Sequence, residues 1–487
     1  MSNRDSLEKY IRKNLKDRSF YIVTNREPYI HNKTFEGIEV TRPSGGAHTL
    51  LELIARVSQG TYIAHGAGSA DKQVVDKNNC IKMPPKEKLF TLKRVFLSKK
   101  ELEYFYYGFT NQTLWPLCHA VFVKPEFNPL WWESYKEVNR KFAQTVLDDV
   151  GDKKAFVWVN DYHFCLLPQM LRESGKDIKI GTFWHIPWPT YEIFRVNPWA
   201  KELLIGLLGS DLLAFHRGYQ AQNFVQSVQR ELEAKIGHEQ SKIVYKEHLT
   251  KIENLEAGID YQEIVDLNNK GKTIRRSFMT KLFGMDIPFL ILGVDRLDYT
   301  KGIIERLKMI DRFFEKHPEY IEKVVYYGIM PQSRFHIPAY RAYAKNVTDL
   351  AEKINWKYST GRWVPIHYTL NGLSGRDKVF QYYKQANVCL VTSLDDGMNL
   401  VAKEYVIACD AEKGSLVLSK FTGASNDLRY STLINPYNIE EGADAIFKAL
   451  NMDPKDRKIR NLKMRKELKE RNIYNWAIRF IEKTLYE

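Results

Sequence analysis

Two basic residues, Arg296 and Lys301, lie in the segment LGVDRLDYTKG at 292–302. The guanidinium of arginine is a rigid fork that pairs with phosphate oxygens, and a nearby lysine adds a compact positive charge. The apolar run at 289–294 predicts a buried strand before them, and the apolar spacing at 303–314 predicts a helix after them. Ligands bind at such strand-to-helix loops in open α/β sheets, beside helix amides that favour anions. The pattern predicts a diphosphate pocket, and two solvated residues on a surface turn are the alternative.

A second polar loop follows the apolar run at 388–392, which predicts another buried strand. Asp396 and Asn399 lie on this loop and are suited to hydrogen bonds with hexose hydroxyls. The residues from Leu400 onward predict a helix whose first backbone amides face an anion. Glu404 lies one turn further on and can accept hydrogen bonds from the vicinal hydroxyls of a ribose. Helix N-capping with a surface carboxylate is the alternative.

Asp161 and His185 each follow a predicted strand, at 156–159 and at 178–184. The carboxyl ends of parallel strands meet at one rim of a sheet, so we expect these two side chains close together. Such a pair is a candidate for catalysis, and a histidine satisfied within the core is the alternative.

Arg26 follows a predicted strand at 20–24, and Gly45 and Gly46 precede a predicted helix at 47–57. Two glycines allow the backbone to approach a phosphate or a sugar closely. A plain loop is the simpler interpretation, because the glycines do not form a GxGxxG fingerprint.

Aromatic residues are concentrated in the segment 104–132, which contains Tyr106 and Trp115. Clusters of this kind usually pack in a core. They can also bind sugars, because sugar C–H faces pack on rings while the hydroxyls seek polar neighbours.

The 487 residues are too many for one ordinary core and predict two large domains. The net charge is 73 − 59 = +14, and much of the excess lies in a predicted helix at 455–469, where a solvated face explains it. We find no RNA-binding signature, so nucleic acid is the least favoured partner. Five scattered cysteines without a CxxC pair, and an N-terminus without an apolar signal segment, favour a reducing cytoplasm. The longest apolar region, 203–215, is too short to span a bilayer.

The two loops together resemble a known family. RLDYTKG at 296–302 and DGMNLVAKEY at 396–405 are similar to motifs of the trehalose-6-phosphate synthases, glycosyltransferase family 20. Shorter matches follow one order along the chain: TNR at 24–26, GG at 45–46, LWP at 114–116, NDYH at 160–163, HIPWPTYEIF at 185–194 and NPY at 435–437. The resemblance therefore extends from about residue 20 to the C-terminus.

The resemblance implies an α/β fold of the GT-B type, with two Rossmann-like doubly wound domains facing a central cleft. We expect an N-terminal acceptor-binding domain at 1–258 and a C-terminal domain that binds the nucleotide sugar at 259–455. The helix expected over 456–485 would fill the last segment, 456–487, and cross back to the first domain, as in other members of the family.

The resemblance also implies an activity: transfer of glucose, with retained α configuration, from a nucleotide diphosphate glucose to glucose 6-phosphate. UDP-glucose is the expected donor and α,α-trehalose 6-phosphate the expected product, which places the chain in trehalose biosynthesis. The residues that match donor contacts are Gly45, Gly46, His185, Arg296, Lys301, Asp396, Gly397, Met398, Asn399, Leu400, Val401 and Glu404. Those that match acceptor contacts are Arg26, Tyr106, Trp115, Asp161 and Arg334. Those expected to take part in the chemistry are Asp161, His185, Arg296 and Lys301.

No metal or other cofactor is expected. The hard step is departure of the nucleoside diphosphate, and Arg296, Lys301 and helix amides can stabilise the charge on its phosphates. The sequence has no D-x-D triplet, so a metal-binding motif of that type is absent. Retention without a clear nucleophile favours front-face attack, with the leaving phosphate taking the proton of the acceptor. Double displacement with Asp161 as the nucleophile is the less favoured mechanism.

The sequence departs from the best-known members of the family in two places on the acceptor half. His65 stands where they have a tryptophan, and the run CHAV at 118–121 replaces Phe-His-Tyr-Arg. A glucosylglycerol-phosphate synthase, a pseudo-glycosyltransferase and a non-catalytic sugar-phosphate sensor are therefore alternatives. The expected partners are the small-molecule substrates, with a separate trehalose-phosphate phosphatase acting on the product. Neither nucleic acid nor a membrane is expected, and a homo-oligomer is left open.

Overall fold

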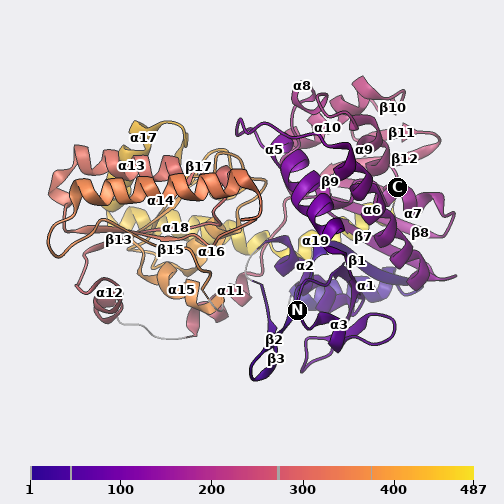
Figure 1. The fold of residues 1–487 in the computed structure, drawn as a ribbon, viewed down its shortest axis with the longest axis horizontal. Coiled ribbons are helices and arrows are strands. Elements are labelled where there is room, and N and C mark those ends of the chain that lie inside the picture. Colours follow the sequence, from indigo (N-terminus) through magenta and orange to yellow (C-terminus); the bar gives the residue numbers. More distant parts are fainter. Residues whose placement is uncertain (1–2, 44–45, 271–274, 374–375, 487) are drawn as a thin grey trace. The chain divides into compact units, whose positions relative to one another are not determined.

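The computed structural model describes residues 3–43, 46–270, 275–373 and 376–486 of the chain. The described chain divides into two compact units (Figure 1). Unit 1 consists of Met1–Gly258 together with Asn472–Glu487, and unit 2 consists of Ile259–Arg471.

Unit 1 is built on a sheet with the strand order β10-β11-β12-β9-β8-β7-β1-β4-β6-β5. The strands from β12 to β6 in this order are parallel, whereas β10, β11 and β5 pair antiparallel at the two edges. The central strands are almost wholly buried, as expected for strands covered on both faces. The strands are β1 (Arg18–Arg26), β4 (Thr61–His65), β5 (Cys80–Met83), β6 (Phe90–Val95), β7 (Lys154–Asn160), β8 (Ile178–Trp184), β9 (Leu212–Phe215), β10 (Lys235–Ile236), β11 (Lys242–Tyr245) and β12 (His248–Asn254), with β2 (Ile30–Thr34) and β3 (Gly37–Thr41) forming a separate hairpin.

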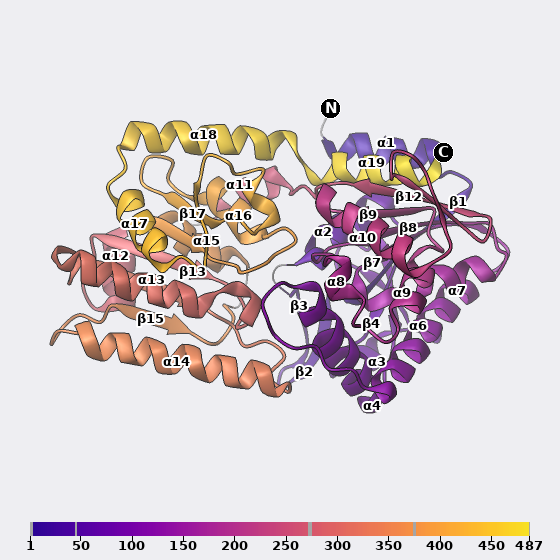
Figure 2. The same cartoon turned by 90° about the horizontal axis from the view of Figure 1, so that it is seen from above.

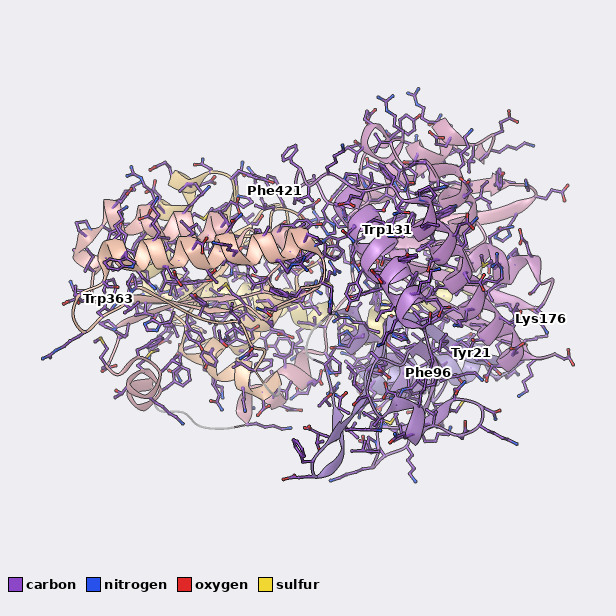
Figure 3. The ribbon with its side chains drawn as sticks, in the orientation of Figure 1. Tyr21, Phe96, Trp131, Lys176, Trp363 and Phe421 are labelled. Carbon is purple, nitrogen blue, oxygen red and sulfur yellow. The ribbon has the colours of Figure 1, made fainter. Side chains whose placement is uncertain are left out.

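Helices cover the sheet of unit 1, and one of them is a π-helix, η1, at Leu102–Leu114. Trp131 of α6 lies over Gly108 of η1 (Figure 3), where a Cβ atom would come within 2.7 Å of the indole ring. The close packing of η1 on α6 therefore requires a residue without a side chain at 108. The other helices are α1 (Asn3–Asn14), α2 (Ala47–Ser58), α3 (Asp71–Val74), α4 (Lys99–Glu101), α5 (Trp115–Cys118), α6 (Pro129–Val150), η2 (Tyr162–Phe164), α7 (Leu167–Glu173), α8 (Tyr191–Phe194), α9 (Ala200–Leu207), α10 (Gly218–Glu231) and α19 (Ile473–Leu485).

The single helix expected over 456–485 is wrong: the structure has two helices, α18 (Pro454–Glu470) and α19. The helix is interrupted before Asn472, whose side chain accepts from the backbone N–H of Asn475 and caps the start of α19. α18 packs on α16 in unit 2, whereas α19 lies beside α1 in unit 1 (Figure 2). The aromatic rings of Trp158 and Phe480, 4.0 Å apart between centroids, bind α19 to the sheet of unit 1.

Every described helix of the chain is too short or too polar to span a lipid bilayer.

Unit 2 contains a parallel sheet with the strand order β15-β14-β13-β16-β17-β18. The strands of unit 2 are β13 (Phe289–Val294), β14 (Val324–Ile329), β15 (Ile366–Thr369), β16 (Val388–Val391), β17 (Ser415–Ser419) and β18 (Thr432–Ile434). Its remaining helices are α11 (Tyr261–Asn269), α12 (Arg275–Phe283), η3 (Tyr299–Lys301), α13 (Ile303–Lys316), η4 (Pro318–Tyr320), α14 (Pro338–Tyr358), α15 (Arg376–Gln385), α16 (Leu400–Ala408), η5 (Gly423–Ser425) and α17 (Ile439–Leu450).

Candidate active site

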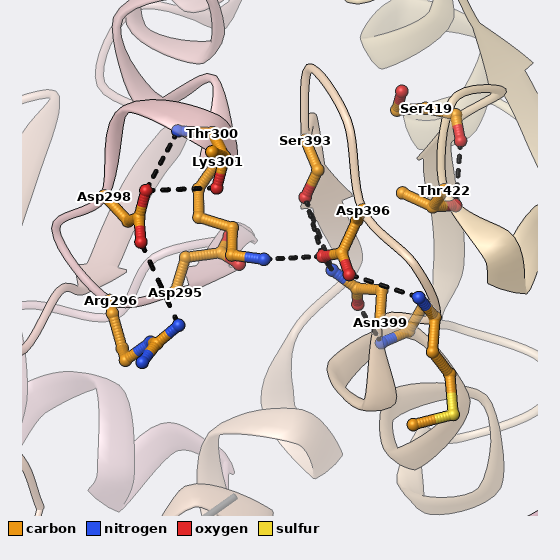
Figure 4. A network of polar contacts seen from close by, with 12 residues as sticks. Asp295, Arg296, Asp298, Thr300, Lys301, Ser393, Asp396, Asn399, Ser419 and Thr422 are labelled. Carbon is orange, nitrogen blue, oxygen red and sulfur yellow. Dashed lines mark hydrogen bonds and ion pairs between the residues drawn. The ribbon is translucent and has the colours of Figure 1, made fainter. Parts of the chain in front are cut away.

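The loop between β13 and α13 carries both basic residues of the first motif (Figure 4). Asp298 begins the turn η3, because its Oδ1 accepts from the backbone N–H of Thr300 at 3.1 Å. Gly302 ends the turn at φ 60°, and a Cβ atom there would lie 2.1 Å from the carbonyl oxygen of Thr392. The turn therefore depends on glycine, and it delivers Lys301 toward the neighbouring loop.

Arg296 and Lys301 are held differently. The side chain of Arg296 is 36% exposed, and its nearest carboxylate oxygen, on Asp298, is 3.9 Å away. The side chain of Lys301 is 13% exposed and its Nζ lies 2.6 Å from Oδ2 of Asp396. Arg296 is thus open to an incoming anion, whereas Lys301 already forms an ion pair.

Asp396 reaches Lys301 because β13 and β16 are neighbouring parallel strands, so the loops after them lie side by side. The Asp396 carboxylate also accepts from the Asn399 side chain at 3.1 Å and from the backbone N–H of Met398 at 3.2 Å. Burial raises the pKa of Asp396, but the charge of Lys301 and the hydrogen bonds from Lys301, Asn399 and the Met398 backbone together hold that pKa below its usual range. The group is therefore a carboxylate at neutral pH.

Asn399 caps helix α16, since its Oδ1 accepts from the backbone N–H of Ala402 at 3.0 Å. The capping interpretation is thus confirmed for this residue. Leu400 and Val401 follow as the first two residues of α16, where backbone N–H groups have no partner within the helix. The loop before the cap is pinned to η5, because the carbonyl of Met398 accepts from Ala424 N–H at 2.7 Å.

Glu404 and Arg334 complete the polar residues expected in unit 2. Glu404 is buried, so the alternative of a surface carboxylate is wrong, and it accepts from the hydroxyl of Tyr383 at 3.3 Å. Arg334 is also buried and donates to the hydroxyl of Tyr340 at 2.6 Å and to Oδ2 of Asp298 at 3.4 Å. Asp298 therefore connects Arg334 to the loop that carries the first motif.

Asp161 and His185 come together in unit 1, as their positions after neighbouring parallel strands predict. The backbone N–H of His185 donates to Oδ1 of Asp161 at 3.0 Å. Asp161 has φ 72°, a left-handed conformation that is costly for a residue with a side chain and is common at functional sites. Burial lowers the pKa of His185 to about 3, so its ring is neutral at neutral pH.

Arg26 is the exposed last residue of β1, and its Nη2 lies 3.4 Å from the hydroxyl of Tyr106. Tyr106 belongs to the π-helix η1, a form of helix that often marks functional sites. Its ring is parallel to that of His163, at 6.1 Å between centroids. Arg26 and Tyr106, which are 80 residues apart in the sequence, are thus brought together by the fold.

Trp115 lies in the core of unit 1. Its ring packs on His119 at 4.1 Å and on Tyr162 at 5.7 Å between centroids. Trp115 is only 6% exposed, so the core-packing interpretation is confirmed for this residue.

Gly45 and Gly46 precede α2. Gly46 has φ 85°, which favours glycine, and Gly45 lies outside the described residues. His65 ends β4 and is buried, with its Nδ1 3.1 Å from the carbonyl oxygen of Val95. A carbonyl only accepts hydrogen bonds, so Nδ1 of His65 carries the proton.

Sequence reasoning missed a buried ionic cluster next to Arg26. Arg94 donates through Nε to Oε2 of Glu27 at 2.7 Å, and its Nη2 forms an ion pair with Oδ1 of Asp71 at 2.8 Å. The same Nη2 lies 2.8 Å from Nδ1 of His31. No local pattern marks these residues, because they come from three separate segments of the chain.

Similar proteins identify the family. The profile described as Glycosyltransferase family 20 matches residues 18–486. The UDP-forming alpha,alpha-trehalose-phosphate synthase of Pichia angusta is 33% identical over 480 residues, covering 95% of this chain and 98% of its own length. The trehalose-6-phosphate synthase of Mycobacterium leprae is 35% identical over 479 residues, covering 96% of this chain and 95% of its own.

Comparison with solved structures points to the same family as the sequence comparisons. The E. coli structure with bound UDP-2-fluoro glucose superposes with a TM-score of 0.85 at 29% identity, over 96% of this chain and 99% of its own. The UDP-forming alpha,alpha-trehalose-phosphate synthase of Burkholderia xenovorans in complex with glucose-6-phosphate superposes with a TM-score of 0.83 at 28% identity, over 96% of this chain and 99% of its own. The expected GT-B fold, with two Rossmann-like domains, is confirmed. Because the family profile and these likenesses extend over nearly the whole chain, this protein belongs to glycosyltransferase family 20.

Proposed function

We propose that this protein transfers glucose from UDP-glucose to glucose 6-phosphate with retention of configuration, forming α,α-trehalose 6-phosphate and UDP. The observation that carries the proposal is the pair of loops after β13 and β16, which juxtapose Arg296, Lys301 and the start of α16. Relatives that match over the whole chain are named as UDP-forming synthases of this product, which supports the same donor and acceptor here.

The donor diphosphate binds Arg296 and Lys301 in this proposal. Arg296 is partly exposed and can form a bidentate contact without losing a strong partner. Lys301 turns from Asp396 toward the phosphates, and the Asp396 carboxylate then accepts hydrogen bonds from the glucose hydroxyls. The amides of Leu400 and Val401 complete the anion site.

The remaining donor contacts follow the family match. The Glu404 carboxylate accepts from the two ribose hydroxyls, one on each of its oxygens. The ribose then replaces the Tyr383 hydroxyl as the donor to Glu404. Met398 and Asn399 are assigned to the glucose hydroxyls and His185 to the neighbourhood of the glucose. Gly397 is a further donor contact, and Gly46 belongs, with Gly45 outside the described residues, to the loop assigned to the donor.

The reaction proceeds without a metal ion in this proposal. Negative charge develops on the UDP phosphates as the glycosidic bond breaks, and Arg296 and Lys301 stabilise it where a metal would otherwise do so. The leaving phosphate takes the proton of the acceptor hydroxyl, which attacks from the same face. Asp161 orients that hydroxyl, because one of its oxygens is already engaged by the His185 backbone.

The acceptor phosphate binds Arg26 with help from the Tyr106 hydroxyl, and Arg334 is a further proposed contact. Charge-assisted hydrogen bonds of this kind make the phosphate the main determinant of acceptor binding. Trp115 acts from within the core by supporting Tyr162 and the Asp161 loop rather than by facing the sugar.

A panel of donors and acceptors with product identification by NMR tests the function. We expect UDP-glucose with glucose 6-phosphate to be the best pair and the product to be α,α-linked trehalose 6-phosphate. Free glucose should react at least about tenfold more slowly, a difference of roughly 1.4 kcal/mol. A faster reaction with glycerol 3-phosphate would instead identify a glucosylglycerol-phosphate synthase, and substrate binding without turnover would identify a sensor.

A further inference from the structure

Two buried histidines meet at the carboxyl edge of the sheet in unit 1. His185 follows β8 and His216 follows β9, and the parallel register pairs Trp184 with Phe215 directly before them. Nδ1 of His185 lies 3.3 Å from Nε2 of His216. The two residues are 9% and 2% exposed, respectively, so their ring nitrogens depend on partners within the protein.

The direction of every hydrogen bond in this chain of groups is determined by its two ends. The backbone N–H of Ala257 can only donate, and it donates to Nδ1 of His216 at 3.4 Å. His216 therefore carries its proton on Nε2 and donates to Nδ1 of His185. His185 then carries its own proton on Nε2, which donates to Oδ1 of Asn160 at 3.3 Å. At the other end, the Asn160 amide donates to the carbonyl of Val23, which can only accept, also at 3.3 Å.

We propose that His216 is a positioning residue that holds His185 in the tautomer with its proton on Nε2 and so fixes the backbone that binds Asp161. The proposal rests on the proposed function, since it assigns His185 and Asp161 to glucosyl transfer. The backbone N–H of His185 binds Asp161, so the ring and the carboxylate move together. Asp161 needs this support because its left-handed backbone is strained.

The His185 ring consequently does not exchange protons with the substrate. Both of its nitrogens are bonded to protein groups, and a second proton on Nδ1 would remove the acceptor that His216 requires. The surroundings are aromatic, with Phe183 at 4.6 Å and Trp476 at 6.4 Å between ring centroids, so a broken hydrogen bond there is not replaced by water. His185 acts as a fixed neutral dipole instead of a general base.

Nitrogen NMR of the full chain with ¹⁵N-labelled imidazoles tests the tautomer directly. The His185 resonances are assigned by their loss in His185→Asn. At neutral pH we expect His185 Nδ1 to be unprotonated and Nε2 to carry the proton. A proton on Nδ1, or rapid exchange between both tautomers, overturns the proposal. This measurement does not use activity, so it also stands if the proposed function fails.

Two variants of similar size test the positioning role. His216→Leu removes the donor to His185, whereas His216→Gln keeps an N–H at a similar distance from the backbone. We expect His216→Leu to lower kcat roughly tenfold, or about 1.4 kcal/mol, with less than about a twofold change in the KM for UDP-glucose. His216→Gln should recover most of the loss.

Equal kcat values for the two variants overturn the positioning role. So does a fall in kcat that is accompanied by a changed KM and a matching fall in the free energy of unfolding. If His216→Leu does not fold, the tautomer of His185 is measured by nitrogen NMR in His216→Gln and in the wild type. The same tautomer in both supports the positioning role, and a different one overturns it. If no donor and acceptor pair is turned over, the proposed function has failed, whereas the tautomer of His185 is measured independently.

Discussion

The polar residues of the two units are organised in opposite ways. In unit 2, Arg296 and Lys301 lie on a loop at the edge of the sheet, where the carboxylates of Asp298 and Asp396 are close to their positive charges. In unit 1, His185 is neutral and its hydrogen bonds run in one direction between buried groups. An ion pair between loops can be replaced by a contact with a charged ligand. A buried network of hydrogen bonds that all run in one direction instead fixes the positions of its side chains.

The charges that unit 1 does bury serve the fold. Arg94 is fully buried between Glu27 and Asp71 beside the loop of Arg26. Burial, and then the hydrogen bond with Asp71, raise the pKa of Glu27 from 4.5 to about 8. Burial also acts on Asp71, but its hydrogen bonds and Arg94 lower its pKa. One proton therefore stays on this pair at neutral pH, and the cluster with Arg94 is close to neutral.

The comparison predicts that Arg94→Met destabilises the protein strongly. Removing one partner of a buried ion pair leaves uncompensated charge and typically costs about 3–5 kcal/mol. The measurement is the free energy of unfolding in urea. Lys82→Met is the matched control, because Lys82 is exposed and donates to the hydroxyl of the half-buried Thr91 at 2.8 Å, so its loss should change stability by less than about 0.5 kcal/mol. Equal stability of the two variants would show that the cluster does not support the fold.

Arg296→Ala should have the reverse pattern, losing turnover while keeping stability. We expect kcat/KM to fall by about 2–4 kcal/mol of transition-state stabilisation, as for loss of a donor at a developing anion. The side chain is partly exposed and has no close carboxylate partner among the described residues, so the unfolding free energy should change by less than about 0.5 kcal/mol. Lys345→Ala, on the exposed face of α14, is the control for loss of one positive charge. Near-wild-type turnover of Arg296→Ala would refute the assignment of this loop.

The shared proton of unit 1 predicts a dependence of stability on pH. The folded state binds the Glu27 proton more tightly than the unfolded state, because the pKa rises from 4.5 to about 8 on folding. The resulting stabilisation is full below about pH 4.5 and is lost as the pH rises through 8. The slope should be about 1.4 kcal/mol per pH unit in this window.

Unfolding in urea at several pH values measures this slope. Glu27→Gln, which is neutral at every pH, should lack it, whereas Glu36→Gln on the exposed hairpin should keep it. A Glu27→Gln variant with the wild-type slope would mean that the proton resides elsewhere.

The smallest effect is expected from chelation. If Arg296 and Lys301 alone supply the positive charge that stabilises the leaving diphosphate, thorough treatment with EDTA should change kcat by less than about twofold, or roughly 0.4 kcal/mol. The assay is turnover before and after chelation, with magnesium or manganese added back. A loss of activity that either metal restores would show that these residues do not suffice.

Local patterns in the sequence predicted most of the central strands and the loops of unit 2. The run at 289–294 is β13 residue for residue, and the strand at 178–184 is β8. The motifs after β13 and β16 are contiguous, so their neighbours in the chain are also their neighbours in space. Buried parallel strands are continuous apolar runs, which is why they were readable without a structure.

Other features required contacts between distant segments. The antiparallel edges of the unit 1 sheet, the π-helix η1 and the break between α18 and α19 all depend on what each segment packs against. The segment 456–485 contains no proline or glycine to mark a break. Only the cap that Asn472 forms on α19 and the division between two cores reveal where the first helix ends.

The sequence by itself determined which residue types stand at the strand ends, and through them the class of chemistry. Only the tertiary structure decided their partners: Asp396 for Lys301, Asp161 for the backbone of His185, and His216 for its ring. The physical reason is that the chemical groups of a side chain are set by its type, whereas its hydrogen-bond direction and its pKa are set by burial and by neighbours from other strands.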